Sequence, residues 1–208
     1  MLLTMKFYDV NSLSELPPPS QGERFFDFIG GEKEVRCFLA PEDMSRGTFM
    51  AEHRYLLGEA LQPIYNHNGI CVSQDTSCPL PGFYIVSPVE QYTSMDKVDE
   101  VLHIRLSFVV REVRKAMREV LGIEYTHVLY EEKASKGCHV HYWILPIDDI
   151  NKHPRLYEFD VKAYMDQFSF KENKEKICTY NAKMRDHFKQ INLMKRDDET
   201  TQKLKEIS

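Results

Sequence analysis

Two histidines stand two residues apart in an apolar and aromatic run, CHVHYWILP, over residues 138–146. Side chains alternate across a β-strand, so a strand here places His139, His141 and Trp143 on one face and the apolar residues between them on the other. Burial of an unpaired imidazole costs free energy, and two of them on one face therefore indicate a polar cleft. The two imidazoles are the first candidates for chemistry in this chain.

Three interpretations of the H-x-H pair compete. In the first, both histidines are hydrogen-bonded at a sheet surface, and because H-x-H occurs often by chance this interpretation ranks first from the motif alone. In the second, both side chains bind one metal ion, since zinc readily takes imidazole ligands. A third ligand is then required, and the candidates, none fixed by spacing, are His67, His127 and Glu131. In the third, one imidazole attacks phosphorus and the other orients it or the substrate.

The rest of the sequence predicts the elements that position this run. β-rich segments bounded by turn residues predict strands over 34–39, 69–75, 82–88, 124–131 and 138–145. Apolar residues at helical spacing predict a long helix from Asp96, its N-cap, to Leu121, with Gly122 as the stop. Further helices are predicted over 49–61, 160–168 and 173–191. This order indicates an α+β fold with a mainly antiparallel sheet, one long helix and C-terminal helices.

Composition narrows the class of protein. The 208 residues suffice for one domain with its own core, and the apolar and charged fractions, 42% and 28%, are those of a globular protein. Five cysteines without a C-x-x-C pair favour neither a disulfide framework nor a zinc knuckle. A net charge of -5 argues against binding of long nucleic acid. The apolar runs are too short for a membrane segment or a signal peptide, which favours a cytoplasmic location.

Several motifs occur in an order that resembles the histidine-triad (HIT) superfamily. Asp75 follows a predicted strand, the step Pro81–Gly82 opens the next strand, and IVSP over 85–88 ends it. The predicted long helix comes next, and the chain returns in HVHYWILP over 139–146. In that superfamily an acidic residue or Asn ends a strand, a Pro-Gly step opens the next, and a strand with H-φ-H-φ-H closes the domain. The resemblance covers roughly residues 64–146.

The resemblance implies a nucleotide-binding enzyme that is a hydrolase or a nucleotidyltransferase. His141 has the place of the middle histidine, which attacks the α-phosphorus of a nucleotide and leaves a nucleotidyl-imidazole intermediate. His139 has the place of the first histidine, which helps to orient the site. Asp75 has the place of the residue that takes the ribose hydroxyls, and a carboxylate with two acceptor oxygens suits a cis-diol.

Two departures from the superfamily pattern bear on mechanism. The third triad position holds Trp143, whose indole N–H donates a hydrogen bond but cannot take up a proton. The galactose-1-phosphate uridylyltransferase branch has Gln there and is active, so leaving-group protonation or the handling of water is expected to differ here from the ordinary hydrolases. The usual G-Q-[ST] loop is replaced by KASKGC. Its residues Lys133, Ser135 and Lys136 are expected to hold phosphate oxygens, unless the loop is simply solvated.

The resemblance also divides the chain and indicates its partners. We expect a flexible leader over 1–24, a HIT-like domain over 25–150 and a helical C-terminal extension over 151–208, of which the polar end, 195–208, frays. The substrate is then a nucleotide or nucleotide conjugate, and the protein is a homodimer paired through the long helix and the adjacent strand. Attack by imidazole requires no cofactor, although a divalent cation can accompany a polyphosphate substrate. Two alternatives stay open: a catalytically silent nucleotide-binding or scaffold module of this fold, and a metal-dependent H-x-H enzyme on another fold.

Overall fold

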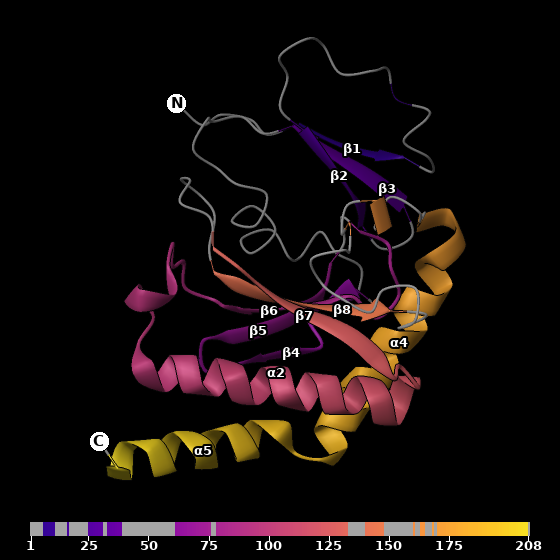
Figure 1. The fold of residues 1–208 in the computed structure, drawn as a ribbon. Coiled ribbons are helices and arrows are strands. Elements are labelled where there is room, and N and C mark those ends of the chain that lie inside the picture. The colour runs from indigo at the N-terminus through magenta and orange to yellow at the C-terminus, as the bar shows by residue number, and fades with distance from the viewer. Residues whose placement is uncertain are drawn as a thin grey trace, which may run out of the picture.

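A five-stranded antiparallel sheet carries the H-x-H strand (Figure 1). The structure is a computed structural model, and it describes residues 6–10, 16, 25–30, 33–38, 61–75, 78–132, 140–147, 160, 163–164, 168 and 170–207. The strand order is β4-β5-β6-β8-β7, with bounds Tyr65–His67, Ile70–Gln74, Tyr84–Pro88, His141–Ile147 and Tyr125–Glu131. Each neighbouring pair of this sheet is antiparallel, which confirms the predicted fold class. The H-x-H strand, β8, is an inner strand between β6 and the edge strand β7.

Alternation along the strands separates the two faces of this sheet. Val72, Val86 and Ile144 are fully buried in a core that they form with the long helix α2 (Glu100–Leu121). The residues between them point the other way, where Leu145 belongs to a second, smaller apolar cluster. We call the side that faces away from α2 the outer face of the sheet.

The long helix α2 lies flat on the inner face of the sheet (Figure 1). It begins later than predicted, because Asp99, not Asp96, is the N-cap and accepts a hydrogen bond from the Leu102 amide at 3.1 Å. Asp96 lies in a short 3-10 helix, Met95–Lys97, that precedes α2. Both aspartates can cap a helix, and the sequence pattern did not distinguish them. Gly122 ends the helix at a φ of 69°, as predicted.

Two C-terminal helices, α4 (Phe170–Gln190) and α5 (Leu193–Ile207), pack against α2. Figure 1 shows α5 running along α2 on the side away from the sheet. The prediction that residues 195–208 fray is wrong, because this segment forms most of α5. The physical reason is a buried ion pair: Asp197 is fully buried and lies 2.7 Å from the Arg105 guanidinium of α2. A polar tail gives no sign of such a partner in the sequence.

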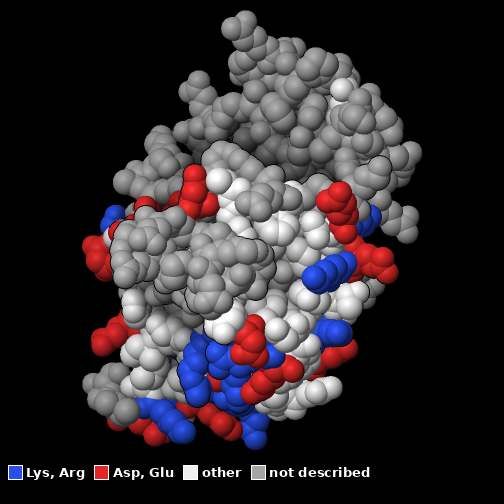
Figure 2. Space-filling view, turned by 45° about the vertical axis from the view of Figure 1, so that its right-hand side comes forward, with Lys and Arg blue, Asp and Glu red and all other residues white. Residues whose placement is uncertain are grey.

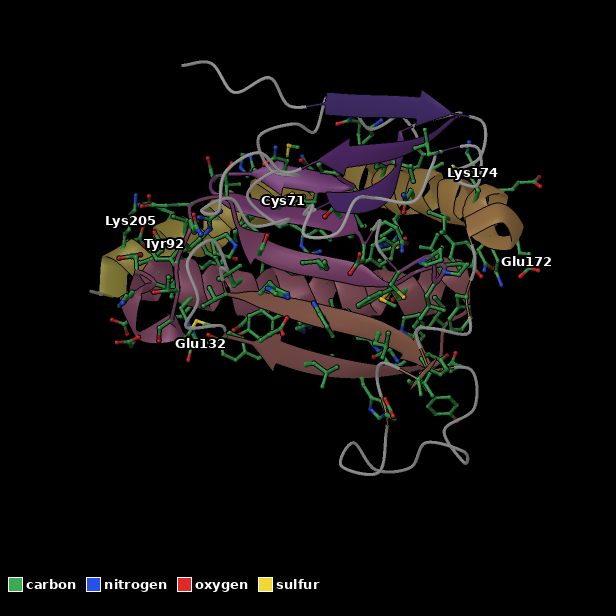
Figure 3. All side chains as sticks on the ribbon, turned by 90° about the horizontal axis from the view of Figure 1, so that it is seen from above. Cys71, Tyr92, Glu132, Glu172, Lys174 and Lys205 are labelled. Carbon is green, nitrogen blue, oxygen red and sulfur yellow. The ribbon has the colours of Figure 1, made fainter. Side chains whose placement is uncertain are left out.

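A second sheet contains the strands β1 (Lys6–Val10), β3 (Lys33–Phe38) and β2 (Phe25–Gly30) in that order. It lies on the outer side of the five-stranded sheet, nearer to β5 than to β7 (Figures 1 and 3). Strand β3 confirms the strand predicted over 34–39, whereas β1 shows that the predicted leader includes a strand. The helix predicted over 49–61 lies outside the described residues.

The surface of the described residues mixes charges of both signs (Figure 2). On α2 and the turn after it, Lys115 lies 3.8 Å from Glu119 and Arg118 lies 3.4 Å from Glu124. Mixed charge of this kind belongs to a solvated surface rather than to a groove for a phosphate backbone. None of the helices in the described part of the chain is long and apolar enough to cross a bilayer.

Candidate active site

The outer face of β8 presents His141 and Trp143, as the alternation in the sequence predicted. Tyr142 and Ile144 point to the other side of the sheet and pack in the core against α2. Trp143 packs with the apolar cluster of the outer face, to which Leu145 belongs. The His141 side chain keeps 14% of its surface exposed, so the imidazole is enclosed without being sealed off.

Glu131 lies directly across from His141 on the edge strand β7. Its Oε2 is 3.0 Å from Nε2 of His141. When His141 is protonated, the two groups form an ion pair at this separation. The sequence suggested Glu131 only as a metal ligand. Its contact with His141 depends on the register between β7 and β8, which the sequence pattern does not give.

Trp143 fills the space beside the imidazole. The ring centroids of Trp143 and His141 are 5.8 Å apart, with 40° between the ring planes. Phe83 meets the indole edge-on, with centroids 5.6 Å apart at 90°. The indole Nε1 is buried and has no hydrogen-bond partner within the described residues. Trp143 therefore forms an apolar wall of the site that is held by ring contacts.

Asp75 follows β5 and is almost fully buried. Its Oδ1 accepts a hydrogen bond from the Cys78 amide at 3.2 Å, and its own amide donates to the Phe83 carbonyl at 3.0 Å. Gln74 braces the same turn, since its Nε2 donates to the Leu80 carbonyl at 2.9 Å. The Asp75 carboxylate thus stabilises a turn, which is the simpler of the two roles that the sequence allowed for it.

Asp75 and His141 lie on the same outer face. Phe83 pairs with the backbone of Asp75, and its ring contacts Trp143, which in turn contacts His141. Strand spacing and rise place the Asp75 and His141 Cα atoms on the order of 15 Å apart. Two side chains with a nucleoside monophosphate between them can bridge that separation.

The first histidine and the predicted phosphate-binding residues lie outside the described residues. They are His139, Lys133, Ser135 and Lys136. The described residues on either side, Glu132 and Val140, both contact the loop before α2: Glu132 accepts a hydrogen bond from the Met95 amide, and the Val140 amide donates to the Tyr92 carbonyl at 2.8 Å. The Met95 hydrogen bond, with others, holds the pKa of the Glu132 carboxyl below its usual range. Figure 3 shows Tyr92 and Glu132 at the same end of the sheet.

In the described part of the chain, which does not include His139, no three His, Cys, Asp or Glu side chains are grouped to hold an ion. His67 lies on β4, at the opposite edge of the sheet from Glu131, and contacts Asp198 at 2.8 Å. His127 shares the outer face with Glu131 but lies four residues before it on β7. It stands across from Leu145 and not from His141. Glu131 therefore contacts His141, whereas His67 and His127 lie elsewhere on the sheet.

The protein is similar to known proteins in its structure, but no similarity in sequence was found. No protein-family model and no curated protein matches the chain. A Hit-like protein involved in cell-cycle regulation from Bartonella henselae is 15% identical, with a TM-score of 0.42 over 68% of this chain and 99% of that chain. A hypothetical histidine triad nucleotide-binding protein from Sulfolobus tokodaii is 18% identical, with a TM-score of 0.41 over 61% of this chain and 85% of that chain.

A HIT family protein from Bacillus anthracis is 14% identical, with a TM-score of 0.45 over 69% of this chain and 97% of that chain. All three similar structures are described as HIT proteins. Similarity this remote carries no information on activity.

Proposed function

We propose that this protein is a nucleotide-binding, HIT-like hydrolase or nucleotidyltransferase in which His141 forms a nucleotidyl-histidine intermediate. The observation that supports the proposal is that His141 and Asp75 share the outer face, at a separation that a nucleoside monophosphate can bridge. An imidazole is a nucleophile toward phosphorus, and a carboxylate can accept hydrogen bonds from a ribose diol. A nucleotide held by Asp75 through its ribose then presents its α-phosphate to His141.

In the proposed reaction, Nε2 of His141 attacks the α-phosphorus and the bond to the leaving group breaks. Water then releases the nucleotide in a hydrolase, and another acceptor does so in a transferase. His139 orients the site, and Trp143 borders the leaving-group side of the phosphate. The phosphate oxygens are held by the loop residues Lys133, Ser135 and Lys136. The attack requires no cofactor, and a divalent cation can accompany a polyphosphate substrate.

Single-turnover labelling tests this proposal. The protein is incubated with conjugates of each common ribonucleotide that carry a radiolabelled α-phosphate, and acid-labile label on histidine is measured. We expect label on the wild type and none on His141→Ala, whose fold is checked by circular dichroism. His103→Ala is the matched control, because His103 lies on α2 beneath the inner face, and it should label like the wild type. Label retained by His141→Ala would contradict the assignment of the nucleophile.

One observation favours a second candidate, a catalytically silent nucleotide-binding module. Nε2 of His141 is engaged by Glu131, and Trp143 packs against the imidazole. In such a module, nucleoside monophosphates raise the melting temperature of the protein but no conjugate labels it. Measuring both quantities on one preparation separates the two candidates.

The assembly and location of the protein are part of the proposal. We expect a homodimer paired through α2 and β7 and a cytoplasmic location. The division into leader, HIT-like domain and C-terminal extension is proposed with them, with the amendment that the leader includes β1.

A further inference from the structure

The nucleophilic nitrogen of His141 is not free to attack in the structure. It lies 3.0 Å from Oε2 of Glu131, and in the ion pair that these groups form when His141 is protonated, the proton occupies the Nε2 lone pair. The carboxylate also stands where the phosphorus has to approach, and its negative charge repels a phosphate. Attack therefore requires that the proton leave Nε2 and that the carboxyl group move away from it.

Trp143 cannot take part in proton transfer, so another side chain must carry the proton. It stands at the third triad position beside His141, but an indole cannot take up a proton. Glu131 is a titratable group on the same outer face, and it already touches the nitrogen whose proton has to move. A positioned acid or base of this kind contributes typically 10²–10⁴-fold to a rate.

We propose that Glu131 is a catalytic residue that carries the proton of the reaction. This inference rests on the proposed function. Oε2 of Glu131 accepts the proton from Nε2 of the His141 imidazolium, and the freed electron pair of Nε2 forms the bond to the α-phosphorus. The bond between phosphorus and the leaving group breaks, and the leaving atom takes the bonding electron pair together with the proton from the Glu131 carboxyl group.

Hydrolysis of the intermediate uses the same group in the opposite direction. The Glu131 carboxylate accepts a proton from water while the water oxygen bonds to phosphorus. The bond between phosphorus and Nε2 breaks, its electron pair returns to Nε2, and the Glu131 carboxyl group gives its proton back to that nitrogen. One water molecule is consumed, and the pair of Glu131 and His141 is restored.

The position of Glu131 allows this exchange of partners. It is the last residue of β7, and its side chain is 27% exposed, about twice the exposure of the His141 side chain at 14%. Its carboxyl group can therefore leave Nε2 when a phosphate enters. Once protonated, it no longer repels the phosphate, so the proton transfer that frees the nucleophile also removes the opposing charge.

The experiment compares Glu131→Gln with the wild type on two conjugates of one nucleoside monophosphate, chosen as the nucleoside that labels His141 best. One conjugate releases p-nitrophenolate, which needs no proton, and the other is an alkyl phosphoramidate, whose amine needs one. In Glu131→Gln we expect phosphoramidate turnover to fall at least about a hundredfold, while formation of the label from the p-nitrophenyl ester falls less than about tenfold. The label on His141 should then persist, because no carboxylate remains at position 131 to accept a proton from the attacking water.

Two further variants keep the result interpretable. Glu124→Gln makes the same change at an exposed carboxylate before β7, 3.4 Å from Arg118, and should leave the ratio of the two rates unchanged. Glu131→Asp keeps a carboxyl group and should retain more phosphoramidate turnover than Glu131→Gln. Equal losses on both conjugates, or no loss on either, overturn the role of Glu131 while the labelled wild type leaves the proposed function intact. A wild type that takes no label overturns the proposed function and this inference with it.

Discussion

At the scale of single residues, the outer face of β8 combines a proton-binding side chain with one that cannot bind a proton. His141 can hold a proton on Nε2, where Glu131 contacts it, whereas the Trp143 indole can only donate a hydrogen bond. The buried, unpartnered Nε1 in the described structure indicates that packing against Phe83 decides the position of Trp143. In the proposed reaction, proton transfer therefore depends on the pair of His141 and Glu131 rather than on Trp143.

The role of Asp75 in binding is predicted at the same scale. Loss of a charge-assisted hydrogen bond costs about 1.5–3 kcal/mol, so Asp75→Ala should weaken nucleotide binding roughly ten- to a hundredfold. Asp75→Asn keeps an acceptor for the Cys78 amide and should lose less. Calorimetry with a ribonucleotide and its 2′-deoxy analogue measures the diol contact, and Asp75→Ala should remove the preference for the ribonucleotide. A preference that persists in Asp75→Ala would mean that Asp75 only stabilises the turn.

At the scale of elements, the turn between β5 and β6 sets the position of Asp75. Gly82 has a φ of 83°, which an L side chain rarely adopts, and a Cβ there would lie 2.7 Å from Cδ1 of Ile123. Its amide donates to Oε1 of Gln74 at 3.3 Å, so the Gln74 side chain also stabilises the turn through the backbone of Gly82. The Pro-Gly step is therefore required by backbone conformation and by a close approach of Ile123.

Gly82→Ala is expected to destabilise the protein by roughly 2–4 kcal/mol, through backbone strain and the contact with Ile123. Gly122→Ala is the control, because Gly122 also has a positive φ, 69°, but nothing lies within 4 Å of its added Cβ. That substitution should cost only about 1–2 kcal/mol. Urea denaturation measures both free energies of unfolding, and equal losses would show that the contact with Ile123 relaxes without cost.

The attachment of α5 to α2 is the second prediction at this scale. Asp197 accepts hydrogen bonds from Arg105 at 2.7 and 2.8 Å and from the Tyr65 hydroxyl at 2.6 Å, and all three side chains are buried. Asp197→Ala leaves a buried guanidinium without its counter-ion, so the free energy of unfolding should fall by about 3–5 kcal/mol. Asp198→Ala removes a carboxylate that is half exposed and should cost less than about 1 kcal/mol. Similar urea midpoints for both variants would contradict a stabilising role of the buried pair.

At the scale of the whole molecule, α4 and α5 leave one side of α2 and the edge strand β7 uncovered by any described element. Val128, Tyr130 and Ile104 on this side are exposed to 45%, 40% and 38%. Tyr130 packs on Tyr142, with ring centroids 5.4 Å apart, so the strand residues continue into the core. Exposed apolar side chains on an edge strand and the neighbouring helix are typical of an interface with another chain.

Val128→Glu is therefore expected to convert a homodimer into a monomer, because it places a charge in the apolar contact. Tyr125→Glu is the control: Tyr125 is as exposed as Val128 but points to the outer face of β7. Light scattering after size-exclusion chromatography measures the mass of each variant. A monomeric wild type, or a Val128→Glu variant that remains dimeric, would contradict pairing through this surface.

The features that could be predicted from the sequence are those that short stretches of chain decide. Alternation placed His141 and Trp143 on one face, helical spacing located α2, and Gly122 marked its end, because each pattern reports a local backbone geometry. The order of Asp75, the Pro-Gly step and the H-x-H pair indicated the residues of the candidate site. Turn residues and the periodicity of apolar residues can be interpreted without knowing which distant residues they contact.

Tertiary structure decided the features that depend on which distant residues meet. The register of β7 against β8 brings the Glu131 carboxylate to His141, and the packing of α5 on α2 gives Asp197 a buried partner in Arg105. A polar residue is stable in the interior only when its partner is there, so the sequence alone described Asp197 as part of a frayed tail and Glu131 as one of several metal ligands. The positions of charged side chains relative to one another are a property of the folded chain, and here they bring Glu131 to His141 and attach the last helix to α2.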